Sequence, residues 1–300
     1  MAMKMLHVVP GLDNPTNGIA VAAKLIAGEQ AAEIVGAREF GKVKDLAKYG
    51  EVWVHSCWLP VTLKACRRVI KAKRPLVRMT HANLDPVRLR YHGWKKWLVG
   101  PIERYFLRRC DRIIATCKAE KEWIEAYLGK RCPPIEVTDI KRFFDLNHVD
   151  HVEQVEGRSL HLLYLGRRHP LKGLEYLEQA VKGIKGIELR IVSNAFGEEK
   201  EKVWEWCDVL VLPTLSENFG LVVAEALERG KRVITTDGAP VWGEGLNRVD
   251  RVERVERVEN GEILFGYEGR LLYLNGYRDG TRGMRVELLK KAIEGLGGSR

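Results

Sequence analysis

The sequence has no long hydrophobic run and little cysteine. No stretch approaches the ~20 uninterrupted apolar residues that a membrane-spanning helix needs. The opening letters, MAMKMLHVVPG, hold too short an apolar run for a secretory signal and predict a first strand instead. The six cysteines form no C-x-x-C pair and are scattered over predicted helices, strands and a loop, which argues against zinc or disulfide frameworks. These absences predict a protein of the reducing cytoplasm without a membrane span.

Positive charge is concentrated in the first half of the chain. The 300 residues are 45% hydrophobic, enough for one large or two medium domains with a real core, and carry a net charge of +10. Residues 1–150 hold 27 Lys and Arg against 16 Asp and Glu, whereas residues 151–300 hold 23 against 24. A basic half indicates an anionic partner, such as a membrane surface, nucleic acid or a phosphorylated glycan.

A strand–loop–helix–strand unit stands out between residues 209 and 237. The uncharged run 209–212 predicts a buried parallel strand, and residues 221–228 predict a helix that Gly230 closes before the next strand at Arg232. The polar elbow 216–220 would then lie at the carboxyl end of a strand. Open α/β sheets bind their ligands there, so the elbow is a candidate site.

The elbow combines a phosphate-binding feature with two carboxylates. Backbone N–H groups at a helix N-terminus favour an anion, yet Glu217 lies beside them and Glu225 follows two turns into the helix. A ligand with both hydroxyls and a diphosphate resolves the conflict, because carboxylates accept hydrogen bonds from sugar and ribose OH groups. Alternatively, Glu217 is an acid stabilised by the helix dipole and Glu225 is solvated.

Two further candidates lie in the first half. Strand 5–9, a loop ending at Gly18, and helix 19–27 form another possible phosphate cradle, although a plain tight turn fits equally. His81 follows the predicted strand 76–80 at its carboxyl end, which is a reasonable place for a site residue. A lone histidine at such a position is also commonly structural.

The remaining elements alternate between strand and helix, which predicts parallel sheets. The other expected strands are residues 33–37, 52–55, 111–116, 135–138, 160–165, 188–192 and 261–265. The other expected helices are residues 60–73, 118–128, 174–181 and 286–296. Residues 147–159 lack helical periodicity and predict a linker. The three-residue repeat at 248–259 matches neither a strand nor a helical stripe, so we interpret it as a surface insertion without chemistry.

A second cation-bearing loop follows the strand at 160–165. Arg167 and Lys172 flank this glycine-bracketed loop, and two fixed cations there could neutralise a departing diphosphate without a metal. The alternative is that both side chains are solvated loop bases.

Residues 61–109 combine bases with aromatic residues. Residues 61–75 contain six bases and no acid, and residues 88–109 contain seven bases against one acid, with Trp94 and Trp97 among them. This composition is typical of an interfacial membrane helix, and Gly100–Pro101 predicts two helical pieces, the second starting at Pro101. An ordinary amphipathic helix packed on the sheet is the alternative. No nucleic-acid motif accompanies the charge, so we expect no nucleic-acid partner.

These segments resemble the retaining glycosyltransferases of family 4. The elbow and its helix match the run S-E-x-F-G-x-x-x-x-E-A with its E-x7-E pattern, and residues 166–173 match G-R-x-x-x-x-K-G. Residues 55–60 and 80–86 are similar to H-x-x-W-x-P and P-H-G-M-L-D-P, and residues 103–117 match the first part of E-R-x-x-L-R-x-A-D-x-I-x-A-T-S-x-x-E, in members that act on bacterial lipopolysaccharide core or exopolysaccharide.

The resemblance implies a GT-B fold, an α/β architecture with two Rossmann-like domains whose parallel sheets face each other across a cleft. The expected boundaries are 1–157 for a basic acceptor-side domain and 158–300 for a nucleotide-sugar-binding domain. The implied catalytic residues are His81, Arg167, Lys172 and Glu217. The implied donor-binding residues are Gly18, Arg167, Lys172, Asn218, Phe219, Gly220, Leu221 and Glu225.

The function so implied is retaining transfer of a hexose from a UDP- or GDP-sugar to a lipid-linked or polysaccharide acceptor. The leaving phosphate would take the acceptor's proton, and the lack of any D-x-D sequence agrees with metal independence and with no cofactor. The enzyme would work at the inner face of the cell membrane, held on anionic lipid by residues 61–109.

The chain also departs from the family. The region between Ile191 and Asp208 is short and lacks the usual G-x-G-P segment, residues 135–139 replace the usual I-P-N-G-V-D hinge, and Cys117 replaces a common serine. These departures leave the nucleotide base open. The short base-binding region also leaves a catalytically silent nucleotide-sugar or lipid-binding module as an alternative. A sugar-nucleotide epimerase is an alternative within the same fold, although no motif suggests it.

Overall fold

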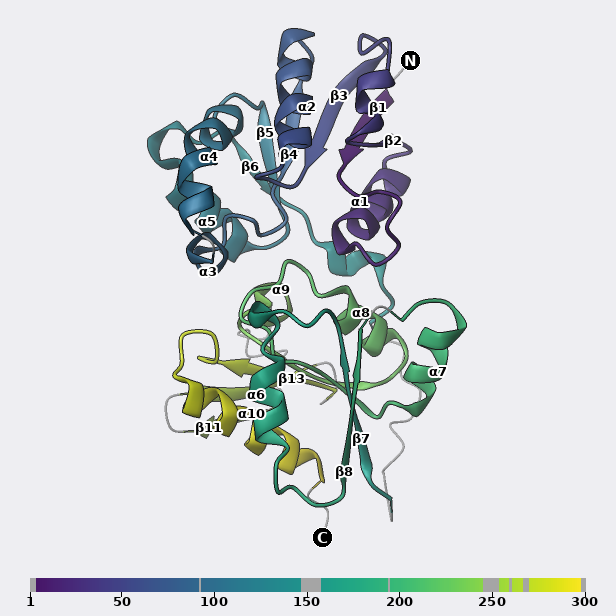
Figure 1. Ribbon diagram of the computed structural model, residues 1–300, viewed down its shortest axis with the longest axis vertical. Helices are drawn as coiled ribbons and strands as arrows, with labels where there is room; N and C mark the ends of the chain where they lie inside the picture. Colours follow the sequence, from purple (N-terminus) through teal and green to yellow (C-terminus); the bar gives the residue numbers. More distant parts are fainter. Residues whose placement is uncertain are drawn as a thin grey trace. The chain divides into compact units, whose positions relative to one another are not determined.

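The computed structural model describes residues 4–91, 93–146, 158–193, 195–244, 254–258, 261–266 and 270–297. The chain divides into two compact units, Met1–Ile140 and Lys141–Arg300, and each is built on its own sheet (Figure 1). No helix of the described residues is long and apolar enough to cross a membrane.

The first unit has a six-stranded parallel sheet in the order β2-β1-β3-β4-β5-β6. Its strands are β1 (Lys4–Val9), β2 (Glu33–Gly36), β3 (Tyr49–His55), β4 (Leu76–Met79), β5 (Arg112–Ala115) and β6 (Ile135–Val137). The chain leaves β1 for β2 on one side and returns to β3 on the other. This reversal is a topological switch point, where parallel sheets open a crevice at the strands' carboxyl ends.

Helices cover both faces of this sheet. They are α1 (Gly18–Glu29), α2 (Pro60–Lys71), α3 (Pro86–Arg90), α4 (Gly93–Leu107) and α5 (Lys118–Leu128), with 3-10 turns at Glu39–Lys42 and Gly129–Arg131. Small residues of α1 pack on Val9, whereas α2, α4 and α5 bury their apolar sides against the opposite face. The alternation of side chains along β1 assigns each residue to one of these two layers.

The second unit has a seven-stranded sheet in the order β11-β12-β13-β10-β9-β7-β8. Its strands are β7 (Leu160–Leu165), β8 (Ile187–Val192), β9 (Val209–Leu212), β10 (Arg232–Thr236), β11 (Arg254–Val258), β12 (Gly261–Gly266) and β13 (Leu271–Asn275). Its helices are α6 (Leu174–Ala180), α7 (Glu198–Trp206), α8 (Leu221–Glu228), α9 (Pro240–Gly243) and α10 (Arg282–Gly297), with 3-10 turns at Ile140–Phe143 and Pro170–Lys172. β11 and β12 pair antiparallel, β12 and β13 also do, and the other pairs are parallel.

The chain order reverses again in this sheet, between β7 and β9. α6 and α10 pack side by side on one face over the apolar residues of β7, β9 and β13. The loops after β7 and β9 therefore flank the switch point of the second unit. Both carry residues that the sequence singled out.

Several expectations of local structure were wrong. Pro101 does not divide two helices: α4 runs through it, and the Tyr127 hydroxyl donates to the Gly100 carbonyl at 3.2 Å, which ties this turn to α5. Part of the 248–259 repeat forms a strand, because residues 254–258 pair with β12 as β11, while its other residues lie outside the described part. The sequence also did not predict α7, α9 or β13.

The predicted domain boundary after residue 157 falls within 147–157, outside the described residues, and stays a prediction. The described residues before that gap pack on the second unit. Lys141 Nζ donates to the Val241 and Glu244 carbonyls, each at 3.2 Å, and Arg270 Nη2 donates to the Leu146 carbonyl at 2.8 Å. These contacts account for the division at Lys141.

Candidate functional site

Two loops of the second unit meet through their backbones at the switch point. The loop 166–173 follows β7, and the loop 213–220 follows β9. Thr214 Oγ1 and the Leu215 N–H both donate to the Leu171 carbonyl at 2.9 Å. Gly173 has a left-handed backbone (φ +67°), and a Cβ there would overlap the Pro213 carbonyl oxygen. The two loops therefore form one framework.

That framework joins two of the predicted site residues. Lys172 Nζ forms an ion pair with Glu217 Oε2, and their side chains are 16% and 17% exposed. Two hydrogen bonds to the main chain hold Glu217 in place. Its N–H donates to the Gly238 carbonyl at 2.7 Å, and its Oε1 accepts from the Asn218 N–H at 2.9 Å. The result is a cation and a carboxylate in contact, both reachable from solvent.

Arg167 lies in the same loop and is exposed. Its guanidinium makes no hydrogen bond or ion pair to any described residue, whereas its carbonyl accepts from the Tyr164 hydroxyl at 2.9 Å. Burial, with the nearby Glu217 charge, raises the pKa of Tyr164 to about 12, so this phenol remains a donor at neutral pH. The arrangement holds the loop and leaves the Arg167 cation available for an anion.

The elbow leads into α8 through a left-handed glycine. Gly220 has φ +72° and directly precedes Leu221, the first residue of the helix. The Phe219 ring is buried against Phe144 and Trp242, and Trp242 Nε1 donates to the Phe219 carbonyl. Phe219 therefore presents its backbone, and not its ring, to any ligand at the N-terminus of α8.

Glu225 lies on α8 but does not contact the Lys172–Glu217 pair. It forms an ion pair with Lys200 of α7, Nζ to Oε2 at 2.6 Å, and both side chains are 24% exposed. Sequence reasoning missed Lys200 because it missed α7, whose few apolar residues give a weak helical pattern.

Asp237 is a second residue that sequence reasoning missed. It follows β10 directly, next to Gly238, and accepts the N–H groups of Gly276 at 2.9 Å and Arg278 at 2.6 Å. Burial outweighs these hydrogen bonds and raises its pKa from 3.8 to about 6. A carboxylate immediately after a predicted strand was the available signal.

In the first unit, Gly18 is the first residue of α1, one residue before the predicted start of this helix. The preceding Asn17 caps the helix by accepting the Ile19 N–H, and its amide donates to the Pro10 carbonyl at 2.8 Å. The cap closes the loop after β1 into a compact turn.

His81 lies at the carboxyl end of β4, as predicted, but it is fully buried. Its Nε2 lies 2.9 Å from Nδ1 of His55, whose Nε2 lies 3.0 Å from Nδ1 of His7; His7 Nε2 in turn lies 2.8 Å from Gln30 Oε1. Burial lowers the pKa of His81 to about 3 and that of His7 to about 4, and it lowers the pKa of His55 strongly. All three rings are therefore neutral at pH 7.

A buried carboxylate holds the His81 loop. His81 and Ala82 both have left-handed backbones with φ +54°, a conformation that needs outside support. Glu120 supplies it by accepting from the Thr80 hydroxyl, the Ala82 N–H, and the N–H and hydroxyl of Thr116 at 2.7 Å. Sequence reasoning assigned no role to Glu120.

A buried ion pair supports the neighbouring strand end. Arg78 Nη2 lies 2.8 Å from Glu103 Oε1, and both side chains are inaccessible to solvent. Arg78 also donates to the Ser56 carbonyl at 2.7 Å, and Glu103 Oε2 accepts the Trp58 N–H at 2.7 Å. The pair therefore shapes the segment that follows β3.

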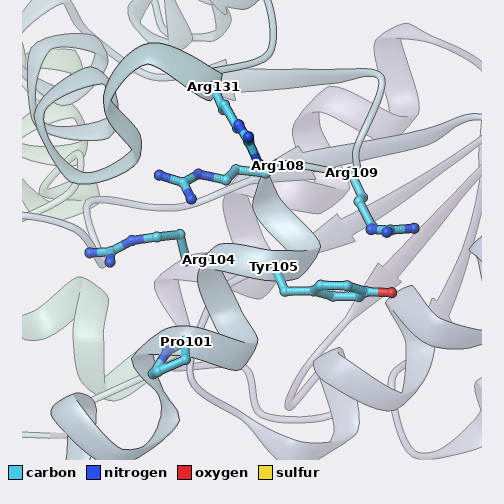
Figure 2. A pocket seen from close by; sticks show the side chains of 6 residues that line it. All are labelled: Pro101, Arg104, Tyr105, Arg108, Arg109 and Arg131. Carbon is cyan, nitrogen blue, oxygen red and sulfur yellow. The ribbon is translucent and has the colours of Figure 1, made fainter.

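The basic segment predicted to meet a membrane contains an arginine-lined cavity. It has a volume of about 490 Å³ and is lined by Pro101, Arg104, Tyr105, Arg108, Arg109 and Arg131. Figure 2 shows Arg104 and Arg108 extending in the same direction, with Arg131 reaching toward Arg108, while Arg109 and Tyr105 point the other way. None of the four arginines forms an ion pair with a described residue.

Several apolar residues of α4 face solvent. Trp94 is 65% exposed and Trp97 78%, and Leu98, Ile102 and Tyr105 are each at least half exposed. Other bases of residues 61–109 serve the fold: Arg68 donates to the Phe40 and Val43 carbonyls, and Lys96 to the Arg88 and Tyr91 carbonyls. The exposed surface is therefore narrower than the sequence implied, and it centres on α4.

Family models match the chain in tandem. The model described as Glycosyltransferase Family 4 matches residues 39–148, and the model described as Glycosyl transferases group 1 matches residues 146–248. No protein in the curated set matches this sequence.

Solved structures share the fold over nearly the whole chain. HepE of Anabaena, in complex with UDP and glucose, is 15% identical with a TM-score of 0.60 and covers 98% of this chain and 90% of its own. Sucrose-phosphate synthase of Thermosynechococcus elongatus is 11% identical with a TM-score of 0.63, covering 98% and 90%. The lipopolysaccharide outer core galactosyltransferase WaaB, in its apo form, is 12% identical with a TM-score of 0.53, covering 98% and 91%. At these identities the matches establish the fold, which is GT-B as predicted.

Proposed function

Since the chain belongs to the glycosyltransferases of the GT-B fold, with a family 4 domain followed by a group 1 domain, we propose that it transfers a hexose from a nucleotide-sugar with retention of configuration. The acceptor in this proposal is a lipid-linked sugar or polysaccharide of the cell surface. The observation that carries the donor half of the proposal is the Lys172–Glu217 ion pair at the switch point of the second sheet.

Donor binding would break the Lys172–Glu217 ion pair and give each residue a new partner on the donor. A diphosphate attracts Lys172 and the exposed Arg167, and it also accepts from backbone N–H groups at the start of α8. Glu217, released from Lys172, then accepts hydrogen bonds from hydroxyls of the donor sugar. Because the ion pair is partly exposed, little free energy opposes the exchange.

Glu225 would bind the ribose in this arrangement. A carboxylate offers about four lone-pair positions, so Glu225 can accept a ribose hydroxyl and keep Lys200. HepE was solved with UDP-glucose, which supports a UDP-sugar as the first donor to test here.

The chemical step would depend on positive charge held at the leaving group. Arg167 and Lys172 stabilise the charge that develops on the departing diphosphate, without a metal in this proposal. The leaving phosphate oxygen then takes the acceptor hydroxyl's proton while the new glycosidic bond forms on the same face. His81, neutral and buried, would position a reacting group and would not supply a proton.

A thermal-shift screen of UDP-, GDP-, ADP- and dTDP-sugars tests the donor site. We expect one nucleotide to raise the melting temperature, with the same shift in EDTA and a smaller shift in Glu217→Ala. Lys290→Ala, an exposed residue of α10, is the control that leaves the shift unchanged. If no nucleotide-sugar shifts the protein, the donor proposal is wrong; if a donor binds but is neither transferred nor hydrolysed, the protein is a silent binding module.

We also propose that α4 places the enzyme on an anionic membrane surface, where lipid-linked acceptors reside. Its exposed Trp94 and Trp97 would enter the lipid interface while the arginines of the cavity meet lipid phosphates. Flotation with vesicles containing phosphatidylglycerol should recover the protein at low salt, and Trp97→Ala or Arg108→Ala should reduce the recovery. Equal recovery with neutral vesicles, or none with either, would contradict the membrane proposal.

A further inference from the structure

The arginine-lined cavity gathers like charges from two elements of the first unit. Arg104 and Arg108 lie one turn apart at the end of α4, and Arg131 comes from the 3-10 turn that follows α5. Figure 2 shows Arg131 reaching toward Arg108, and none of the described residues that line the cavity is acidic. Like charges so arranged repel one another, so an anion bound among them would remove an unfavourable interaction.

The protein holds these guanidinium groups in place without pairing their charge. Arg104 lies over the Tyr127 ring, with its Cζ 4.5 Å from the ring centroid, and its Nε is buried with no hydrogen-bond partner among the described residues. Arg108 donates to the Leu128 carbonyl at the end of α5. One stacking contact and one carbonyl leave most of the guanidinium donors unused. The cavity therefore contains cations that are oriented but still able to bind an anion.

The cavity lies away from the switch point of the first sheet. Arg108 is followed within a few residues by β5, and Arg131 is followed by β6, so both stand near the amino ends of these strands. Open α/β sheets bind the ligands on which they act beyond the carboxyl ends of their strands. An anion in this cavity would therefore be separate from the reacting sugar and diphosphate, and it would anchor the enzyme to whatever carries it.

An exposed tryptophan continues the same face of α4. Trp97 precedes Arg104 by about two helical turns, so Trp97, Arg104 and Arg108 follow one stripe of the helix. The Trp97 side chain is largely exposed. Tryptophan beside cations is typical of a helix that lies in a lipid interface, where the ring enters the apolar boundary and the cations meet headgroups. This continuity indicates that the anion belongs to a lipid.

We propose that the cavity is a recognition site for a phosphomonoester headgroup of a lipid, and that it selects this group over a phosphodiester headgroup. A phosphomonoester carries nearly two negative charges at neutral pH, because its second pKa is about 6, whereas a diester carries one. Guanidinium groups match phosphate oxygens in geometry, and several of them together favour the group with more charge and more free oxygens. The choice of a lipid rests on the proposed membrane contact of α4, whereas binding of the phosphate does not.

Soluble short-chain lipids test the headgroup without a membrane. Calorimetric titration of the full chain with dihexanoyl phosphatidic acid and with dihexanoyl phosphatidylglycerol compares the monoester with the diester. We expect the monoester to bind about tenfold more tightly, the effect of one additional charge-assisted hydrogen bond. Arg104→Gln and Arg131→Gln should each remove this preference. Lys130→Gln, the exposed neighbour of Arg131 that does not line the cavity, is the matched control and should keep it.

The same titrations contain the outcomes that would overturn the proposal. If the monoester and the diester bind equally, or if neither binds, the cavity is not a phosphomonoester site. Because Arg131 is exposed, Arg131→Gln decides the assignment even where Arg104→Gln fails to fold. Lowering the pH from about 7.5 to about 5.5 should weaken binding of the monoester and not of the diester, because only the monoester gains a proton in this range.

Inorganic phosphate distinguishes a lipid headgroup from a free ligand. It should compete with the short-chain monoester but bind more weakly, because it makes no contact with Trp97. Trp97→Ala should therefore weaken binding of the lipid and leave binding of inorganic phosphate unchanged. If inorganic phosphate binds as tightly as the short-chain lipid, the site takes a free phosphate and the assignment to a lipid is wrong.

Flotation extends the test to a membrane surface. Vesicles with phosphatidic acid are compared with vesicles that hold about twice as much phosphatidylglycerol, which matches the surface charge. Recovery should be higher with phosphatidic acid, and Arg131→Gln should lower it to the level of phosphatidylglycerol. Equal recovery of the wild type would overturn the selective site and leave the general membrane contact standing. A protein that binds the monoester but transfers no sugar would count against the proposed function alone.

Discussion

The two sheets have the same kind of switch point but arrange charge there in opposite ways. In the first unit the polar side chains at the strand ends are buried. The residues inaccessible to solvent are Arg78, His55, His81, Glu103 and Glu120. In the second unit the paired groups, Lys172 with Glu217 and Lys200 with Glu225, remain partly exposed.

This difference suggests a division of tasks. A buried polar network is rigid, because moving any member leaves another unpaired in a medium of low dielectric. A partly exposed ion pair exchanges partners at little cost. The first unit therefore offers a fixed surface at its strand ends, and the second offers charges that a ligand can take over.

The largest expected effect comes from breaking the Arg78–Glu103 pair. Arg78→Met leaves an unpaired buried carboxylate and should lower the free energy of unfolding of the first unit by about 3–5 kcal/mol. Urea denaturation followed by peptide-resolved hydrogen exchange assigns the loss to this unit. Lys172→Met, the matched change in the second unit, should cost no more than about 1 kcal/mol.

The double variant Arg78→Met, Glu103→Leu separates the charge from the packing. We expect it to recover most of the lost stability, because no buried charge remains. If Arg78→Met and Lys172→Met lower the free energy of unfolding by the same amount, the proposed contrast between the buried network of the first unit and the partly exposed ion pairs of the second is wrong.

Lowering the pH should decrease the stability of the first unit through His7 and increase that of the second through Asp237. His7 has a pKa of about 4 when folded and 6.5 when unfolded, so the unfolded chain binds the extra proton and the first unit loses about 3 kcal/mol between pH 6.5 and 4. Asp237 has a pKa of about 6 when folded and 3.8 when unfolded, so its contribution to the second unit rises by about 3 kcal/mol as the pH falls through that range.

Calorimetry of the full chain at pH 6.5, 5.5 and 4.5 measures this difference. The transition assigned to the first unit should move to lower temperature, and it should separate from the transition of the second unit. His7→Asn should reduce the shift, and Asp237→Asn should remove the opposing contribution. Parallel movement of both transitions in wild type would contradict the sign argument.

The smallest effect is expected at Lys200. Its pair with Glu225 is partly exposed, so Lys200→Met should change the free energy of unfolding by less than about 1 kcal/mol. Donor binding should also change little, because Glu225 keeps its hydrogen-bonding oxygens. A loss above about 2 kcal/mol in urea denaturation would show that this pair is structural and would place α7 with the rigid parts of the molecule.

Local patterns predicted the elements that form from uncharged runs or clear periodicity. β7, β9, α5 and α8 begin and end at the predicted residues, because apolar runs or regular apolar spacing meet a glycine, proline or capping residue. The loops at Lys172 and Glu217 were predicted as separate candidates. Their contact follows from the order of β7 and β9 in the sheet, which no local pattern contains.

The elements that sequence reasoning missed depend on contacts between distant residues. α4 passes through Pro101 although that proline lacks an N–H, since the turn is tied to Tyr127 of α5. Residues 254–258 of the three-residue repeat form β11 because they pair with β12. His81 was predicted as a lone histidine, yet His7 and His55 reach it because β1, β3 and β4 are neighbours in space.

Two glycines pack closely against the main chain of the loop 213–220, which carries Glu217. Gly173 approaches the Pro213 carbonyl, and Gly238 approaches the Thr214 carbonyl, so closely that neither position has room for a Cβ. The spacing between Lys172 and Glu217 is thus set by the thickness of the backbone. Substituting side chains around this site could change which sugar is accepted, but a donor that needs the cation and the carboxylate further apart would require the main chain itself to be rebuilt.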